Sequence, residues 1–378
     1  MPELAKARVA LVHDWLTGMR GGERCLEVFA ELFPAADLYT LLHVPGSVSA
    51  PIESRRIVTS FLQRLPQAER RYRHYLPLFP AAVRAFDLRG YDLVLSSSHA
   101  VAKSVRVPPG ALHVCYCFTP MRYVWDLYGD YFGPGASPAA RLVMPALAAW
   151  LRRWDRRTAA GVHHFVAISR FVADRIRRAY GREADVIYPP VDVSRFRIDE
   201  APGEYYLVVS ALTPYKRVDL AVEACTRLGR RLLVVGSGPE EGRLRALAGP
   251  TVQFLGWCDD VRVAELYGGC RALLFPPLED FGIAPLEAMA SGRPVIALGA
   301  GGARETVVPP GEGEPPTGLF FARQTVDDVA EAIRRFEASA QQFEPKALRR
   351  RAEAFDRPLF RERIHAYLRA RMEGPAAC

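Results

Sequence analysis

The sequence predicts an α/β protein of two doubly wound domains, and three observations support that prediction. The chain has 378 residues, more than one hydrophobic core usually organises. Apolar runs alternate with helical patterns both before and after a proline-containing segment at 186–205. This alternation favours parallel sheets covered by helices, which bind ligands at the carboxyl ends of their strands. We therefore expect two facing domains with a cleft between them.

The first half of the chain opens with an apolar run at 9–13, which leads through a glycine-rich turn into a helix. The helical pattern consists of apolar residues on one face: Cys25, Leu26, Phe29, Leu32 and Phe33. Further strands are predicted within 91–105, 113–126 and 163–169, and further helices within 145–161 and 170–181. We expect this half, residues 1–200, to form the first of the two domains.

The second half repeats the pattern, and we place the boundary near Ala201, in the proline-containing segment. Strands are predicted within 205–211, 230–238, 252–257, 271–276 and 293–298, and helices within 217–229, 240–249 and 261–270. We expect residues 201–350 to form the ligand-binding domain and 351–378 to form a basic helical tail, interrupted at Pro358.

Composition narrows the class of protein. Hydrophobic residues make up 49% and charged residues 24%, and no apolar run reaches the roughly 20 residues of a membrane span. No signal-peptide pattern precedes the first strand, so we expect a cytoplasmic protein. The seven cysteines do not suggest a disulfide framework, and we interpret Cys115 and Cys117 as buried thiols rather than metal ligands. The net charge of +8 suits anionic partners, but no nucleic-acid-binding motif is present.

The most informative stretch is FPPLEDFGIAPLEAMASGRPVIA, residues 275–297. Glu279 follows a strand, Gly282 lets backbone approach a ligand, and Pro285 suits the first position of a helix. Glu287 then falls in the first turn. A helix N-terminus fed by a glycine-containing loop is an anion site.

Carboxylates bind sugar hydroxyls better than they bind phosphate. A diphosphate with a sugar at each end would therefore satisfy the loop and both glutamates, which is the chemistry of a nucleotide sugar. The alternative is that Glu279 is an ordinary loop residue and Glu287 a first-turn acid favoured by the helix dipole.

The same stretch resembles the E-x7-E signature of retaining glycosyltransferases of family 4, which have the GT-B architecture. Segments in the family's order include HDWLTGMRGGER, CFTPMRYVWD, AISRFVADRIRRAYG, VIYPPVDVSRF, ALTPYKRVDLAVEA and VVGSGPE. The likeness extends over nearly the whole chain. It is strongest to bacterial mannosyltransferases that use GDP-mannose to build O-antigen or exopolysaccharide.

The resemblance implies a role for each matching residue. Glu287 would hold the ribose, and Glu279 would bind the donor hexose and act in catalysis. Lys216 and Arg217 would neutralise the departing diphosphate, as a leaving group that gains charge requires. Further donor contacts are implied for the following residues: Gly21, Gly22, Ser210, Phe281, Gly282 and Ile283.

In the first half, the resemblance implies a catalytic role for His99. Acceptor or sugar contacts are implied for Arg122, Tyr123, Asp126 and Arg170. Ser169 is either near the cleft or simply a helix cap. The expected partners are a nucleotide-sugar donor and a saccharide or polyprenyl-diphosphate-linked acceptor, with transfer that retains an α-linkage. A UDP-sugar donor and a non-catalytic sugar-nucleotide-binding relative are the alternatives.

Two positions depart from the family pattern, since Phe118 replaces a common His and Ala211 a common Arg. No D-x-D triplet is present, and we expect no metal or other cofactor. A dehydrogenase interpretation of VVGSGPEEG fails because Glu241 occupies the place of the third glycine. The basic, aromatic segment 70–86 could be an amphipathic helix that contacts the inner face of the cytoplasmic membrane, or an ordinary surface helix.

Overall fold

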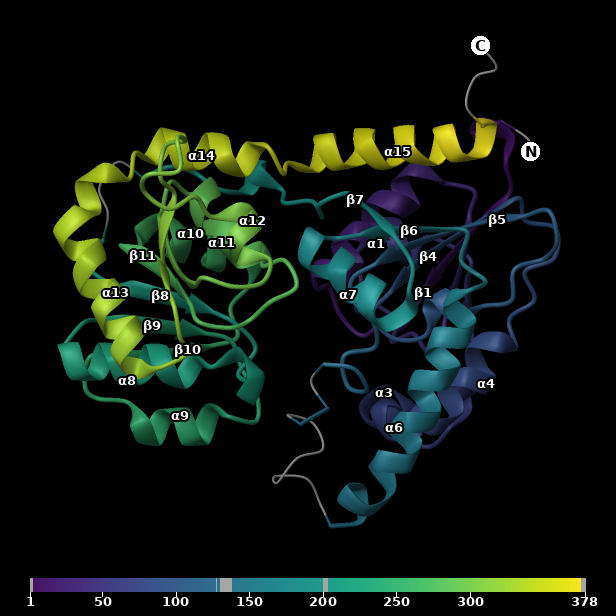
Figure 1. Cartoon of the computed structure of the whole chain (residues 1–378), viewed down its shortest axis with the longest axis horizontal. Coiled ribbons are helices and arrows are strands. Elements are labelled where there is room, and N and C mark those ends of the chain that lie inside the picture. Colours follow the sequence, from purple (N-terminus) through teal and green to yellow (C-terminus); the bar gives the residue numbers. More distant parts are fainter. Residues whose placement is uncertain (1–2, 127, 130–137, 200–202, 375–378) are drawn as a thin grey trace. The chain divides into compact units, whose positions relative to one another are not determined.

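The structure, a computed structural model, describes residues 3–126, 128–129, 138–199 and 203–374, without the side chains of residues 138–140. The chain divides into two compact units (Figure 1). Unit 1 comprises Met1–Pro189 and Phe360–Cys378, and unit 2 comprises Pro190–Leu359. The predicted boundary at Ala201 lies outside the described residues.

Unit 1 is built on a seven-stranded sheet of order β3-β2-β1-β4-β5-β6-β7, and all of its paired strands are parallel. Its central strands are buried along their whole length, as expected when helices cover both faces. The strands are β1 (Val9–His13), β2 (Asp37–Thr40), β3 (Ile57–Thr59), β4 (Leu93–Ser98), β5 (Leu112–Cys117), β6 (His164–Ala167) and β7 (Ala184–Val186).

The helices of unit 1 include three long ones, α1 (Gly21–Leu32), α6 (Pro138–Ala159) and α7 (Arg170–Tyr180). The shorter α-helices are α2 (Ala50–Glu53), α3 (Ala68–Arg71) and α4 (Phe79–Arg84). The 3₁₀ turns are η1 (Leu4–Lys6), η2 (Phe61–Arg64), η3 (Tyr72–Leu78) and η4 (Ala102–Ser104).

A buried ion pair fastens α6 to the segment after β4. The ammonium of Lys103 lies 2.8 Å from the carboxylate of Asp155, and both side chains are almost completely buried. Asp155 also accepts hydrogen bonds of 2.8 Å from the indole of Trp125 and the hydroxyl of Tyr180. Buried charges are tolerated when they are paired and hydrogen-bonded in this way.

Unit 2 has a six-stranded parallel sheet of order β10-β9-β8-β11-β12-β13. Figure 1 shows these strands between α8 and α9 on one side and α10, α11 and α12 on the other. The strands are β8 (Tyr206–Val209), β9 (Leu232–Val235), β10 (Val252–Gly256), β11 (Ala272–Phe275), β12 (Val295–Leu298) and β13 (Gly318–Phe321). Both sheets confirm the predicted α/β fold class.

The α-helices of unit 2 follow the strands in alternation. They are α8 (Val218–Leu228), α9 (Glu241–Leu247), α10 (Asp260–Gly269), α11 (Ile283–Ala290), α12 (Ala303–Thr306), α13 (Val326–Ser339) and α14 (Pro345–Glu353). The 3₁₀ turns are η5 (Val193–Arg195), η6 (Pro214–Lys216) and η7 (Ala340–Gln342).

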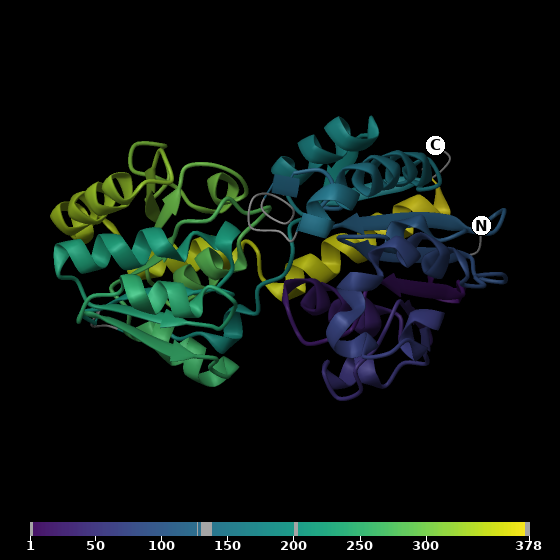
Figure 2. The ribbon, with the colours of Figure 1, turned by 90° about the horizontal axis from the view of Figure 1, so that it is seen from below.

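The last helix, α15 (Arg357–Glu373), belongs to unit 1 from Phe360 onward (Figures 1 and 2). Its buried side chains are Phe360, Ile364, Leu368 and Met372. The ring of Phe360 packs against Phe29 and Tyr116, with centroids 5.8 and 5.6 Å apart. The C-terminal residues thus complete the core of the unit that the N-terminal residues begin.

Two predicted helices differ from the structure. The helix predicted at 145–161 begins seven residues earlier, at Pro138, and includes Pro145. Segment 70–86 is not one helix, because Pro77 and a 3₁₀ stretch separate α3 from α4. Five of its large apolar side chains are buried in the core of unit 1, namely Tyr72, Leu76, Phe79, Val83 and Phe86.

Candidate active site

The loop between β11 and α11 has the conformation that a glycine-dependent binding loop requires. Gly282 precedes α11 with φ 89°, a region that favours glycine. Ile283 begins the helix, so the predicted start at Pro285 is wrong by two residues. Pro285 is tolerated because N–H groups of the first turn lack intrahelical partners.

Glu287 therefore lies in the second turn of α11, and its predicted first-turn position is wrong. Its carboxylate accepts a 3.0 Å hydrogen bond from the hydroxyl of Tyr267 on α10. Tyr267 is fully buried, and this burial, reinforced by the charge of Glu287, raises the pKa of Tyr267 well above its ordinary value. The phenol thus stays protonated and holds the half-buried carboxylate in place.

Glu279 forms an ion pair with Lys216, which lies 63 positions earlier in the sequence. Lys216 ends η6, the turn after β8, and Glu279 follows β11. The pair exists because β8 and β11 are neighbours in the sheet. The side chain of Glu279 is 11% exposed and that of Lys216 is 20% exposed. The structure thus brings together two of the predicted catalytic residues, poorly exposed, at the carboxyl end of one sheet.

The other residues predicted after β8 have local partners. Arg217 has a left-handed backbone, with φ 49°, and its guanidinium pairs with Asp219 at 3.2 Å. The hydroxyl of Ser210 donates a 3.1 Å hydrogen bond to the carbonyl of Ala211. Arg217 and Lys216 thus point their charges at different carboxylates.

Four glycines that the sequence prediction did not include shape the same end of the sheet, namely Gly236, Gly238, Gly301 and Gly302. A Cβ atom at Gly236 would lie 1.9 Å from the carbonyl oxygen of Ser210, and one at Gly238 would lie 2.3 Å from that of Leu212. Neighbouring loops therefore touch backbone to backbone, which explains the glycines of VVGSG without a dinucleotide.

The loop of Glu279 is held in the same way. A Cβ atom at Gly301 would lie 2.5 Å from the carbonyl oxygen of Glu279, and one at Gly302 would lie 2.3 Å from the Cα of Phe281. The N–H of Gly302 donates a 2.9 Å hydrogen bond to the same carbonyl. Because Phe281 is 3% exposed and packs on Phe355, its backbone rather than its ring is the part that faces these loops.

In unit 1, Asp14 organises the segment after β4. Its buried carboxylate accepts hydrogen bonds of 2.7–2.9 Å from four consecutive backbone N–H groups, those of His99, Ala100, Val101 and Ala102. The ring Nδ1 of His99 lies 3.2 Å from the same carboxylate, and its side chain remains 29% exposed. Burial lowers the pKa of His99; Asp14 opposes this shift and His13 adds to it.

His13 and Glu23 lie beside His99. The Nδ1 of His13 lies 2.8 Å from the hydroxyl of Ser97, and its Nε2 lies 3.6 Å from Glu23. Burial acts to raise the pKa of Glu23, but the hydrogen bond and charge of His13 outweigh it and lower that pKa. The sequence prediction missed this group, although polar residues directly at a strand end in HDWLTGMRGGER were a usable signal.

The ring of Phe118 packs against both of these histidines. Its ring centroid lies 6.3 Å from that of His13 and 6.2 Å from that of His99. The backbone of Gly22 packs closely here, since a Cβ atom would lie 3.3 Å from the Phe118 ring and 3.6 Å from His13. Gly21 begins α1. The structure thus gathers the predicted Gly22 and His99 around the residue that departs from the family pattern.

The remaining predicted residues of unit 1 are spread over several elements. Asp126 accepts a 2.9 Å hydrogen bond from the guanidinium of Arg175 on α7, so its carboxylate is already paired. Arg122 and Tyr123 follow β5, and Tyr123 packs against the core. Arg170 is the exposed first residue of α7, and Ser169 caps this helix by accepting from the N–H of Val172 at 3.0 Å.

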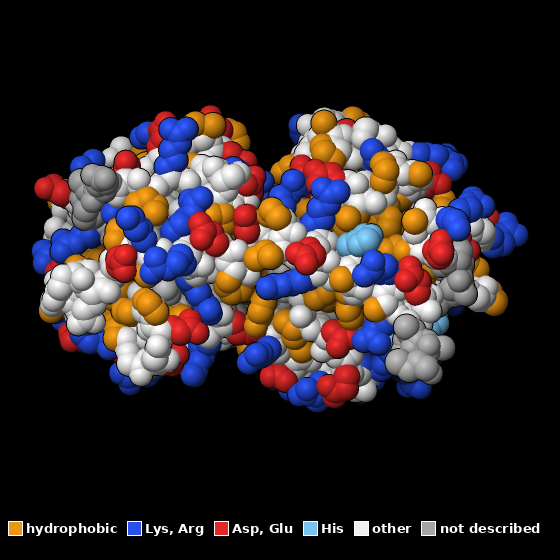
Figure 3. All heavy atoms as spheres, turned by 90° about the horizontal axis from the view of Figure 1, so that it is seen from above, with side chains coloured by type: hydrophobic (Ala, Val, Ile, Leu, Met, Phe, Trp, Pro, Cys, Tyr) orange, Lys and Arg blue, Asp and Glu red, His pale blue; other side chains and the backbone are white. Residues whose placement is uncertain are grey.

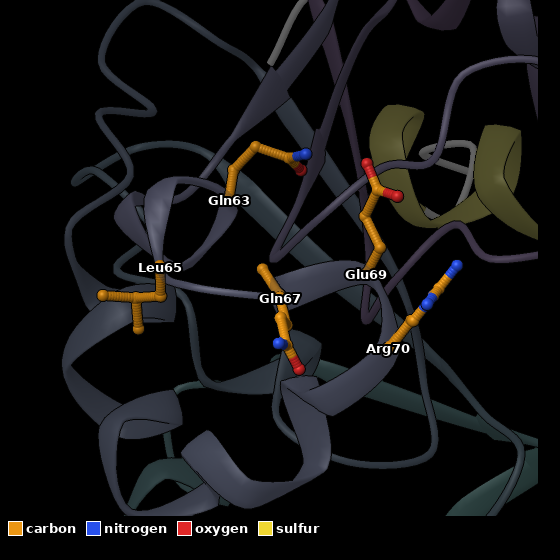
Figure 4. Close-up of a pocket in the computed structure, with 6 residues that line it drawn as sticks. Gln63, Leu65, Gln67, Glu69 and Arg70 are labelled. Carbon is orange, nitrogen blue, oxygen red and sulfur yellow. The ribbon is translucent and has the colours of Figure 1, made fainter.

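A surface hollow of about 400 Å³ lies elsewhere in unit 1. Figure 4 shows its lining side chains, which are contributed by η2, α3 and the turn between them. The lining residues are Gln63, Leu65, Gln67, Ala68, Glu69 and Arg70. None of the residues predicted to act on substrate lines it, and we assign it no role.

The described residues contain no group of three or more His, Cys, Asp or Glu side chains placed to hold a metal ion. Cys115 and Cys117 are buried in β5 as free thiols. On the face in Figure 3, Lys and Arg side chains are interspersed with Asp and Glu. Among the helices described, none is both long enough and apolar enough to cross a bilayer.

Two family descriptions match adjacent parts of the chain. Residues 19–195 match the Glycosyltransferase Family 4 model, and residues 194–355 match the model of Glycosyl transferases group 1. The fold is similar to that of sucrose-phosphate synthase from Thermosynechococcus elongatus, with a TM-score of 0.70, 19% identity and coverage of 96% of this chain and 98% of that one. It is also similar to Anabaena HepE in complex with UDP, with a TM-score of 0.66, 18% identity and coverage of 96% and 99%.

Curated relatives match more locally. A GDP-mannose-dependent alpha-(1-6)-phosphatidylinositol monomannoside mannosyltransferase of Mycobacterium tuberculosis is 31% identical over 244 residues, 56% of this chain and 59% of that enzyme. Glycogen synthase 1 of Rhizobium radiobacter is 32% identical over 154 residues, 37% of this chain and 32% of that enzyme. The matches thus span less than two thirds of these relatives. Together with the fold, the two adjoining family matches identify the chain as a member of the family 4 glycosyltransferases, with the predicted GT-B fold.

Proposed function

We propose that this protein transfers a hexose, mannose from GDP-mannose, to a saccharide or polyprenyl-diphosphate-linked saccharide, with retention of the α-configuration. The observation that carries the proposal is the Glu279–Lys216 pair beside the glycine-lined loop that leads into α11. Support for mannose comes from the GDP-mannose-dependent activity of the mycobacterial relative.

The pair has a clear use in such a reaction. Without donor, the two charges neutralise each other in a poorly exposed site. When a nucleotide sugar enters, Lys216 turns to the diphosphate and Glu279 accepts a hydrogen bond from a hexose hydroxyl. Each side chain thus exchanges its partner in the ion pair for a group of the donor. Arg217 assists with the diphosphate, and Glu287, already oriented by Tyr267, accepts the ribose hydroxyls. Backbone N–H groups of 281–283 face the phosphates.

The transfer needs no protein nucleophile in this proposal. The bond between the anomeric carbon and the phosphate oxygen breaks, and the acceptor oxygen bonds to the same carbon from the same face. The acceptor proton passes to the leaving phosphate oxygen, which Lys216 stabilises. We propose that no divalent metal takes part, so a chelator should leave turnover unchanged.

In unit 1, we propose that His99 contacts the transferred sugar and that Asp14 positions it. Asp14 holds both the backbone and the Nδ1 of His99, which leaves the Nε2 for a ligand. Phe118 offers no hydrogen bond, so His99 would take over a contact that many relatives make with a histidine at that position. Donor contacts are proposed for Gly21 and Gly22, and contacts with acceptor or sugar for Arg122, Tyr123, Asp126 and Arg170.

The decisive experiment compares binding and slow nucleotide release for GDP-mannose, UDP-glucose, UDP-GlcNAc and NADH. Saturable binding of GDP-mannose with release of GDP supports the proposal. A preference for UDP-glucose would favour the alternative suggested by the fold's similarity to a UDP-bound structure. Binding without release, unrelieved by Phe118→His or by candidate acceptors, would indicate a non-catalytic relative.

A further inference from the structure

Helix α6 exposes large apolar side chains that unit 1 does not use. Leu142 is 81% exposed, Val143 59% and Trp150 47%. Three such residues within nine positions of one helix are a concentrated apolar surface rather than scattered single residues, and such surfaces mark contact sites.

The helix has an inner and an outer face. The inner face is buried at helical spacing, by Met144, Ala148, Leu151, Asp155 and Ala159. The outer face combines the three exposed apolar residues with arginines in its last turns. We call this surface, made of Leu142, Val143, Trp150, Arg153 and Arg157, the outer face of α6.

The exposed charges of this helix have one sign. Between residues 141 and 159 the single acidic residue is Asp155, which is buried and paired with Lys103. The exposed charges of the outer face are therefore all positive. A second copy of the same face would be repelled, whereas an anionic surface would be attracted.

Segment 70–86, the other basic and aromatic stretch, is less suited to such a contact. Its large apolar side chains belong to the core, and Leu78, at 40% exposed, is the large apolar residue that it leaves at the surface. The chemistry expected from that segment is present on α6 instead.

We propose that the outer face of α6 rests on an anionic lipid surface. Leu142, Val143 and Trp150 would enter the boundary between headgroups and acyl chains, while Arg153 and Arg157 contact lipid phosphates. The inference deepens the proposed function by naming the surface that meets a lipid-linked acceptor. Lipid binding itself requires no catalysis.

The test measures binding of the full chain to vesicles of phosphatidylcholine alone and of phosphatidylcholine with 30 mol% phosphatidylglycerol. We expect binding to the anionic vesicles at least tenfold tighter than to the neutral ones, and weakened by salt. Leu142→Ser combined with Trp150→Ser should reduce it about tenfold or more. Each of Arg153→Gln and Arg157→Gln should reduce it about fivefold.

Unit 2 provides a matched control, since Trp257 and Val261 are 78% and 72% exposed. The double variant Trp257→Ser, Val261→Ser should bind vesicles like the wild type. Equal losses in both double variants, or no binding by the wild type, would overturn the proposal. A shift from dimer to monomer in Leu142→Ser, Trp150→Ser, without vesicle binding by the wild type, would assign the face to self-association instead.

GDP release without vesicles separates this inference from the proposed function. The α6 variants should release GDP at the wild-type rate, and thermal melting should confirm that they fold. Vesicle binding without turnover of any sugar nucleotide would support the lipid contact of α6 and contradict the proposed glycosyl transfer.

Discussion

Asp14 and His99 lie 85 positions apart in the sequence, yet one carboxylate oxygen of Asp14 contacts both the backbone N–H and the ring of His99. The contact arises because β1 pairs with β4, with His13 in register with Ser97. The residue after each strand then meets its counterpart at the same edge of the sheet.

Asp14→Asn should both loosen this segment and impair His99. An amide offers one acceptor oxygen and turns an N–H₂ group toward N–H donors, so we expect the free energy of unfolding to fall by about 3 kcal/mol. Urea denaturation measures it. Asp92→Asn is the control, because Asp92 accepts one exposed 2.8 Å bond from the N–H of Arg8, and it should cost less than about 1 kcal/mol. Equal effects of the two substitutions would contradict the role of Asp14.

The stability of the protein should fall between pH 7 and pH 5 because of His113. This side chain is completely buried in β5, and burial lowers its pKa to about 3. The unfolded chain, with an ordinary pKa, takes up the proton first, so the stabilising contribution is complete at neutral pH and is lost as pH falls below about 6.5. The loss should reach about 2 kcal/mol at pH 5.

Urea denaturation of the wild type and of His113→Gln at both pH values measures this effect. The variant starts from a lower stability at pH 7, because it disturbs the contact with Ser96, but it should lose less between the two values. An unchanged pH dependence in the variant would show that other groups are responsible.

Glu279 and Lys216 should be energetically coupled in turnover. We expect Glu279→Gln and Lys216→Met each to lower kcat/KM by about 100-fold or more. The first removes the carboxylate that binds a hexose hydroxyl, and the second removes the ammonium that stabilises the leaving diphosphate in the transition state. The double variant should lose less than the product of the two single effects. Glu240→Gln, which breaks an exposed pair with Arg243, is the control and should stay near wild type. Near-normal transfer by Glu279→Gln would refute the assignment.

Gly302→Ala should disturb donor binding through the loop of Glu279. The new methyl group would lie 2.3 Å from the Cα of Phe281, which forces the loop to move and costs about 1–3 kcal/mol. Gly242→Ala, on α9, meets nothing within 4 Å and should be neutral or stabilise by up to about 1 kcal/mol. Calorimetric titration with the sugar nucleotide should reveal weaker binding in Gly302→Ala alone. Equal affinity in the two variants would mean that the close packing of these loops does not shape the site.

Long elements were predictable because their patterns extend over several turns or a fully apolar strand. β1, α7 and α8 lie where the sequence placed them. The strands β2, β3, β7 and β13 were missed because none of them contains three consecutive aliphatic residues, the run that marked the equally short β8, β9, β11 and β12. The start of α11 was misplaced because Pro285 fits the third position of a helix as well as the first.

The residues of the site were more predictable than their pairing. The E-x7-E stretch indicated Glu279 and Glu287 from local sequence, but Lys216 reaches Glu279 only because β8 neighbours β11. Asp14 meets His99 for the same reason in the other sheet. Alternation of strands and helices indicates a parallel sheet. The order of the strands across that sheet depends on tertiary packing, which the local pattern does not contain.

The position of Phe360 in the core of unit 1 has a consequence for biosynthesis. A ribosome makes residues 1–189 before unit 2, but Phe360, which packs against Phe29 and Tyr116, emerges only after all of unit 2. The first unit to be translated should therefore be the last to reach its full stability, and unit 2 can finish folding before it. A protein ending at residue 356 should retain a folded unit 2 beside a destabilised, protease-sensitive unit 1.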